Sequence, residues 1–171
     1  SDSAHRVQVY EHDGTRRAGW PVQVAAITGA HQQVAVGDLT GDGRPAIVVG
    51  DSESDVYAFD ANGEVIEGFP VNLGFFDDTY VAVGPVAAPY RRSIVAAGEG
   101  AVFVINWRGA VQTSWIGKVA SDIGLPPSIG DVDADGVSDI LVPNGTFLTR
   151  FGAEDADPLW TVDFAPARPS A

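Results

Sequence analysis

The feature that most constrains this chain is a repeat of about 47 residues. Three segments align around glycines that are 47 and 46 residues apart: Gly37, Gly84 and Gly130. The segments read VAVGDLTGDGRPAIVVG (34–50), VAVGPVAAPYRRSIVAAG (81–98) and PSIGDVDADGVSDILVP (127–143). In each segment nine residues separate the glycine from the next apolar run. Equal loop length with different composition indicates one structural unit that is repeated along the chain.

A second motif alternates with the first and indicates β-hairpins. It combines an alternating apolar and polar run, a turn glycine and then a large aromatic residue. Dipeptides such as Asn62-Gly63 favour tight hairpin turns because both residues tolerate positive φ. Every unit of a repeat protein buries the same face, so we expect the aromatic residues to pack between neighbouring units. A row of sugar-stacking side chains is the alternative for these four residues: Trp20, Phe69, Trp115 and Trp160.

Helix signals are weak along the whole sequence, and about fourteen strands of five to seven residues are expected. Four antiparallel strands in about 47 residues match the dimensions of one β-propeller blade. The sequence therefore predicts an all-β fold, a β-propeller segment of about three and a half four-stranded antiparallel blades. The whole of 1–171 forms one segment, with a half blade at 7–22 and blades at about 34–71, 81–117 and 127–163.

Propellers need about four or more blades to close, so we do not expect this chain to close alone. The remaining blades would come from the same polypeptide, and the alternative is that a second copy supplies them. The sequence contains no methionine, which indicates a piece of a longer protein.

Charge and composition exclude several classes of function. The net charge is −13, from 23 acidic and 10 basic residues, which argues against nucleic acid as a partner. Cysteine is absent, which excludes disulfides, thiolate zinc sites and a thiol nucleophile. No apolar run is long enough for membrane insertion as a helix. No N-terminal signal pattern is present, although a secreted protein would already have lost it.

The segment GDVDADGVSDILV (130–142) crowds four aspartates beside an apolar run. Two carboxylates about 4 Å apart repel each other by about 1 kcal/mol in water and about 4 kcal/mol at an effective dielectric of 20. The spacing D-x-D-x-D-G-x-x-D places oxygens at alternate positions, and its glycine permits a sharp reversal. A flexible loop with hard oxygen ligands suits Ca²⁺, because Mg²⁺ demands stricter octahedral geometry. The predicted ligands are Asp131, Asp133, Asp135, Asp139 and the Val137 carbonyl, and a solvated acidic turn is the alternative.

The other two copies of the loop differ in their capacity for a cation. The first copy contains Asp38, Thr40, Asp42 and a glycine, but Ala46 stands where the ninth-position carboxylate should be. This loop therefore predicts a weaker cation site, in which water would complete the coordination of the ion. The middle copy, PVAAPYRRS, contains two arginines and no carboxylate, so we expect it to bind no cation.

These loops and the hairpins that end in GWPV and GFPV resemble the FG-GAP and VCBS repeat families. Such repeats form the blades of integrin α-chain propellers and occur in many secreted bacterial proteins. The resemblance covers about 7–162 and implies a calcium-binding propeller. By position it implies the cation ligands Asp131, Asp133, Asp135, Val137 and Asp139, and in the first loop Asp38, Thr40, Asp42 and the carbonyl of Arg44. The middle loop, Ala46 and the missing Phe-Gly and Gly-Ala-Pro signature in most copies depart from the family pattern.

Other chemically interesting residues give weaker signals. The histidines His5, His12 and His31 have no metal-ligand spacing. The acidic run 51–55 could provide paired carboxylates for glycoside hydrolysis, but a solvated hairpin tip is the preferred interpretation. Trp107 stands at a predicted turn and is the best candidate for an exposed contact residue. The triplet 144–146 is a formal glycosylation sequon, for which an Asn-Gly turn is preferred.

These observations predict a non-enzymatic, Ca²⁺-stabilised scaffold of an extracellular or cell-surface protein, which binds a protein or carbohydrate ligand. The alternative is part of a secreted propeller enzyme, a polysaccharide lyase or hydrolase, or its accessory domain. A purely structural spacer is a third possibility.

Overall fold

The computed structural model describes residues 5–25, 33–74, 78–86, 92–119, 123–152 and 155–165. This part of the chain contains fourteen strands and no helix, so the predicted all-β class is confirmed. The described residues therefore contain no helix that could cross a membrane. The strands form one two-stranded sheet and three four-stranded sheets, all antiparallel.

The sheets follow one another along the chain. The half-blade contains β1 (Arg6–Val7) and β2 (Val22–Gln23). Blade 1 contains β3 (Val34–Gly37), β4 (Ala46–Gly50), β5 (Asp55–Phe59) and β6 (Val71–Asn72). Blade 2 contains β7 (Tyr80–Gly84), β8 (Ser93–Gly98), β9 (Ala101–Asn106) and β10 (Val111–Ile116). Blade 3 contains β11 (Ser128–Gly130), β12 (Asp139–Asn144), β13 (Phe147–Gly152) and β14 (Trp160–Asp163).

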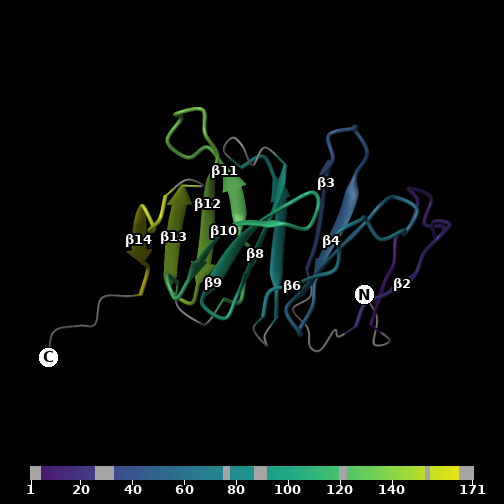
Figure 1. Cartoon of the computed structure of the whole chain (residues 1–171), viewed down its shortest axis with the longest axis horizontal. Helices are drawn as coiled ribbons and strands as arrows, with labels where there is room; N and C mark the ends of the chain where they lie inside the picture. Colours follow the sequence, from purple (N-terminus) through teal and green to yellow (C-terminus); the bar gives the residue numbers. More distant parts are fainter. Residues whose placement is uncertain are drawn as a thin grey trace, which may run out of the picture.

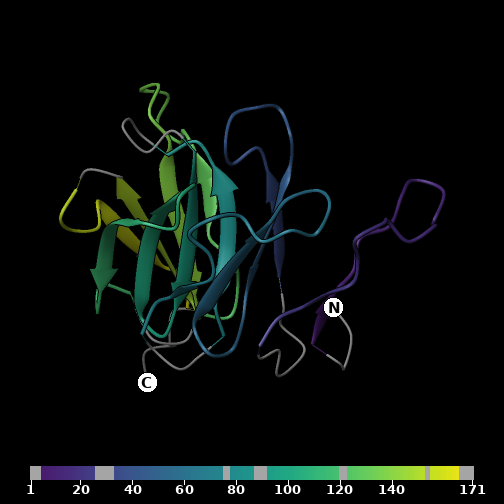
Figure 2. The same ribbon diagram turned by 45° about the vertical axis from the view of Figure 1, so that its right-hand side comes forward.

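Within each blade, spatial order follows sequence order, so every strand pairs with its immediate sequence neighbours. The sheets stand side by side in chain order, from the half-blade at one end to blade 3 at the other (Figures 1 and 2). Several strands are shorter than the expected five to seven residues, and β1, β2 and β6 have only two. Pro21 and Pro70 directly precede β2 and β6, and proline cannot donate a hydrogen bond to a ladder.

The core consists of three apolar clusters, each between two adjacent sheets. Successive side chains of a strand point to opposite faces, so each central strand contributes to two clusters. In β4, Ile47 and Val49 face the half-blade, whereas Val48 faces blade 2. All residues of β4 and β8 are therefore buried. A strand buried on both faces reads as a continuous apolar run, which is why these segments do not alternate in polarity.

The aromatic residues of the hairpin motif lie mostly between the blades. Trp20, Phe69 and Trp115 are buried in the three successive clusters, which confirms the packing prediction for these residues. Trp160 differs, because its side chain is 36% exposed on β14, the outer strand of the last described blade. The same motif is thus buried where another blade follows and exposed at the end of the described sheets.

The glycine that marks each repeat ends an inner strand at the point where the next blade approaches. A Cβ atom added to Gly37 would lie 2.7 Å from Cγ1 of Val83 in blade 2. At Gly84 it would lie 3.2 Å from Cδ1 of Ile129 in blade 3. At Gly130, in blade 3, it would meet no atom within 4 Å. The absence of a side chain at Gly37 and Gly84 therefore lets the inner strands of successive blades lie close together.

We expect Gly37→Ala to lower the free energy of unfolding by about 1–3 kcal/mol, because the new methyl group overpacks a tight interface. Gly84→Ala should have a smaller effect of the same sign, since the nearest atom would lie 3.2 Å from the new Cβ rather than 2.7 Å. Gly130→Ala is the matched control and should stay within about 0.5 kcal/mol of the unsubstituted chain. Urea unfolding of the three variants measures these differences. Equal effects at Gly37 and Gly130 would contradict this account of blade contact.

Candidate metal site

The acidic loop predicted as a cation site connects β11 to β12 in blade 3. The strands pair up to Gly130 and Asp139, so both ends of the loop are fixed by the last register pair of the ladder. Gly136 has φ +87°, in agreement with the reversal that the sequence predicts there. Ala134 also has positive φ, at +61°, which is uncommon for a residue with a Cβ atom and is not predicted by the loop pattern.

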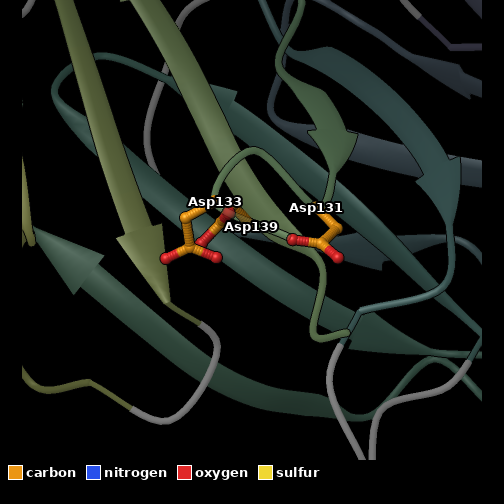
Figure 3. A group of neighbouring side chains, drawn as sticks. All are labelled: Asp131, Asp133 and Asp139. Atoms are coloured by element: carbon orange, nitrogen blue, oxygen red, sulfur yellow. The ribbon is translucent and has the colours of Figure 1, made fainter. Parts of the chain in front are cut away.

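Three carboxylates of this loop converge. Asp131, Asp133 and Asp139 each offer an oxygen, and these oxygens all lie within 4.8 Å of one another. In Figure 3, Asp133 and Asp139 lie together and the carboxylate of Asp131 approaches them from across the loop. Asp139 is only 3% exposed, whereas Asp131 and Asp133 are exposed to solvent. The group thus has one buried and two accessible members.

Backbone N–H groups of the loop hold the carboxylates in place. Asp131 accepts hydrogen bonds from the N–H groups of Asp135, at 3.2 Å, and Gly136, at 2.9 Å. The N–H of Val132 donates to Oδ2 of Asp139 at 3.1 Å. These contacts orient the carboxylates by the fold of the loop itself.

One of the four predicted carboxylates stands apart from the other three. Asp135 is outside the converging group, and its Oδ1 accepts a hydrogen bond from the N–H of Val137 at 2.8 Å. Val137, whose carbonyl is predicted as a ligand, has an exposed side chain. The structure therefore brings together three of the four predicted carboxylates.

Arg150, on β13, joins this group and was not anticipated from the sequence. Its Nε donates to Oδ1 of Asp139 at 2.7 Å, and its Nη2 donates to Oδ2 of Asp133 at 2.5 Å. The hydrogen bond from Arg150 lowers the pKa of Asp133, and the two carboxylates raise the pKa of Arg150. One guanidinium thus pairs with two of the three carboxylates, which leaves a net negative site.

A comparison of the blades supports the pairing of Arg150 with Asp139. Arg150 lies opposite Leu141, two residues after Asp139 in the ladder. The register places Ala58 at the corresponding position of blade 1 and Val104 at that of blade 2. Those blades carry alanine and serine, Ala46 and Ser93, at the ninth position of their loops. Within this chain, the arginine therefore occurs only in the blade that has the ninth-position carboxylate.

The first loop repeats part of this geometry. Asp38 accepts hydrogen bonds from the N–H groups of Gly41, at 2.5 Å, and Gly43, at 3.1 Å, much as Asp131 does in the third loop. The N–H of Arg44 donates to Asp42 at 2.9 Å and lowers the pKa of Asp42, with a smaller contribution from a side-chain hydrogen bond with Thr40. Buried Ala46 occupies the ninth position. This loop therefore contains two carboxylates where the third loop contains four.

The middle loop lies only partly within the described residues. Residues 87–91, which include Arg91, fall outside them. The guanidinium of Arg92 lies against Gly41 of the first loop, in the space that a side chain at Gly41 would fill. An arginine of blade 2 therefore packs against the acidic loop of blade 1.

The acidic run 51–55 has a structural role at its first residue. Asp51 is buried and accepts hydrogen bonds from the N–H groups of Glu53, at 2.9 Å, and Asp55, at 2.8 Å. It closes the turn between β4 and β5, so the expectation of a solvated hairpin tip is wrong for this residue. The reason is that the N–H groups of the turn need an acceptor, and that Asp51 itself contacts the segment leading into blade 2, where the N–H of Thr79 donates to its carbonyl at 3.0 Å.

The remaining candidates are distributed over separate turns. Trp107 is exposed, as expected, and the guanidinium of Arg108 lies 4.3 Å from its ring centroid. Asn144 of the sequon is buried and Gly145 has φ +53°, which confirms the turn interpretation. His12 lies in an exposed turn, His5 contacts the carbonyl of Ala25, and His31 lies outside the described residues.

Comparison with solved structures defines the fold. The chain is similar to BamB from Moraxella catarrhalis, with a TM-score of 0.62, 19% identity, and coverage of 92% of this chain and 42% of that chain. It is similar to BBS1N, solved in complex with ARL6DN, with a TM-score of 0.59 and 16% identity over 94% of this chain and 47% of that one. A protein of unknown function from Bacteroides caccae gives a TM-score of 0.56 and 15% identity over 94% of this chain and 54% of that one.

BamB and BBS1N are β-propellers, so this chain is a β-propeller segment, as the sequence predicts. It spans about half the length of these structures. No family model matches the sequence, and no curated protein matches it significantly. The resemblance to FG-GAP and VCBS repeats thus stays a prediction from the motifs.

Proposed function

We propose that this chain is a calcium-binding β-propeller scaffold of the FG-GAP and VCBS type, which binds a protein or carbohydrate ligand without catalysing a reaction. The observation that carries the proposal is the convergence of the Asp131, Asp133 and Asp139 carboxylates within 4.8 Å. Their spacing also matches the loop pattern that the resemblance associates with Ca²⁺.

The charge balance of the third loop supports a bound divalent cation. Three carboxylates face one guanidinium, and Arg150 occupies one oxygen each of Asp133 and Asp139. Asp131 is free of that guanidinium and receives only backbone N–H groups. Ca²⁺ takes six to eight oxygen ligands from carboxylates, carbonyls and water, so a partly exposed loop can complete its shell with solvent. When bound, the ion would neutralise the loop and tie the ends of β11 and β12 together.

The fold and an exposed aromatic residue favour a role in binding. One propeller neighbour was solved in complex with a second protein, which supports a protein ligand for this scaffold in general terms. The exposed Trp107, with Arg108 stacked against it, is our candidate for a contact residue. Extracellular calcium modules bind with dissociation constants of about 10⁻⁴ to 10⁻³ M, which suits an extracellular or cell-surface location.

Calorimetric titration of Ca²⁺ into the EDTA-treated chain tests the metal proposal. We expect a principal site with a dissociation constant on the order of 10⁻⁴ to 10⁻³ M. Asp131→Ala should abolish it, because this carboxylate is the one that Arg150 leaves free. Asp38→Ala is the matched control: it removes the same kind of loop hydrogen bonds where only two carboxylates are present, and should retain the principal site. The absence of saturable heat, or equal loss in both variants, would contradict the proposal.

A further inference from the structure

Arg150 links two carboxylates of the third loop, and its side chain is largely shielded from solvent. Nε donates to Oδ1 of Asp139 at 2.7 Å, and Nη2 donates to Oδ2 of Asp133 at 2.5 Å. The side chain of Arg150 is only 13% exposed, and Asp139 is buried. The contact between Arg150 and Asp139 therefore belongs to the interior, where ion pairs have larger effects than at an exposed surface.

The guanidinium compensates a carboxylate that the fold buries. Within the described residues, Asp139 receives one hydrogen bond besides those of Arg150, from the N–H of Val132 at 3.1 Å. A buried carboxylate without a counter-charge strongly destabilises a folded chain. Arg150 therefore provides the positive charge that the third loop needs when no cation is bound, so the loop can keep its fold in that state.

A cation in this loop would share its carboxylates with Arg150. The converging group consists of Asp131, Asp133 and Asp139, and Arg150 already contacts the last two. Its positive charge is permanent, because a guanidinium does not lose its proton in proteins. Two cations that share carboxylates repel each other, so each lowers the affinity of the group for the other.

We propose that Arg150 is an internal counter-cation that sets the calcium affinity of the third loop: it weakens binding of the ion and takes its place when the site is empty. The inference rests on the proposed function, because it presupposes that this loop binds Ca²⁺. Asp131, which Arg150 leaves free, and the remaining oxygens of Asp133 and Asp139 are available to the ion. Ca²⁺ can then bind and leave without unfolding of the loop.

Arg150→Gln tests the inference, because glutamine removes the charge and keeps a polar side chain. Ca²⁺ is titrated calorimetrically into the full chain after removal of metal with EDTA. We expect the dissociation constant of Arg150→Gln to be at least about tenfold lower than that of the unsubstituted chain, since repulsion between nearby unit charges exceeds that factor at an effective dielectric of 20. Arg150→Lys keeps the charge and should stay closer to the unsubstituted chain. Arg17→Gln is the matched control: Arg17 pairs with Glu11 in the half-blade, and its loss should leave the dissociation constant unchanged.

Thermal unfolding provides a second measurement of the same coupling. In EDTA, Arg150→Gln should have a lower thermal midpoint than the unsubstituted chain, because Asp139 loses its counter-charge. Saturating Ca²⁺ should remove most of this difference, so the rise in midpoint that Ca²⁺ causes should be larger in the variant. If Arg150→Gln is unfolded in EDTA, Ca²⁺ should restore the circular dichroism of the folded chain.

The outcomes separate this inference from the metal proposal. If Arg150 only holds the carboxylates in position, its removal weakens calcium binding, which is the opposite sign. A dissociation constant of Arg150→Gln that equals or exceeds that of the unsubstituted chain would therefore overturn this inference alone. Equal tightening in Arg150→Lys and Arg150→Gln would also overturn it, because the charge would then not be the cause. The absence of saturable binding in both the unsubstituted chain and Arg150→Gln would overturn the metal proposal as well.

Discussion

Replacement of Trp115 by alanine is expected to lower the free energy of unfolding by about 3–5 kcal/mol, the cost typical of deleting a buried tryptophan. Trp115 is 2% exposed and lies between blades 2 and 3, where its ring centroid is 4.8 Å from that of Phe151. Its indole N–H also donates to the carbonyl of Asp155 at 2.8 Å. The substitution removes apolar contact and leaves that carbonyl without this donor. For a chain of this size, the thermal midpoint should fall by about 6–20 °C.

Trp160→Ala is the matched control for this substitution. The residue type is the same and the position belongs to the same hairpin motif, but the side chain is partly exposed and no described sheet follows it. We expect a loss of less than about 1 kcal/mol, as for most partly exposed positions. Denaturant unfolding of both variants makes the comparison. Similar losses at the two positions would show that the aromatic residues do not act through packing between blades.

Calcium is expected to stabilise the folded chain by about 2.7 kcal/mol when its free concentration is a hundred times the dissociation constant. The thermal midpoint should then lie about 5–11 °C higher in Ca²⁺ than in EDTA. The physical reason is that the ion binds the converged carboxylates of the folded loop, whereas the unfolded chain does not hold them within 4.8 Å of one another. Differential scanning calorimetry in the two buffers measures the shift.

Three controls separate this effect from general ionic stabilisation. Asp131→Ala should show nearly the same midpoint in Ca²⁺ and in EDTA, whereas Asp38→Ala should keep most of the shift. Mg²⁺ at the same concentration should stabilise less than Ca²⁺, because it holds its waters and demands octahedral geometry. A midpoint that is unaffected by chelation in the unsubstituted chain would remove the metal proposal.

The repeat made much of the fold predictable. The glycines Gly37, Gly84 and Gly130 set the period, and the structure shows the physical reason at the first two, where the next inner strand approaches. The nine-residue spacing placed the acidic loop between the first two strands of a blade. These features are local and repeated, so the pattern of one unit predicts the others.

Arg150 could not be assigned to the site from local pattern, because its contact with Asp139 depends on the pairing register of β12 and β13. The sequence does contain one indication of this contact: the arginine occurs in the one blade whose loop has a carboxylate at its ninth position. The orientation of Asp135 could not be predicted from the sequence either. A D-x-D-x-D spacing does not determine which carboxylates turn toward backbone N–H groups. The burial of Asp51 could not be predicted because it depends on the neighbouring blade. The N–H of Thr79, just before β7, donates to the carbonyl of Asp51 at 3.0 Å.

Diffraction from a crystal grown in Ca²⁺, with data that record the anomalous scattering of calcium, tests the central claim most directly. We predict an anomalous peak in the third loop, at about 2.3–2.6 Å from carboxylate oxygens of Asp131, Asp133 and Asp139. A well-ordered loop without such a peak, in which Asp131 turns into solvent and Arg150 alone holds the other two carboxylates, would contradict it.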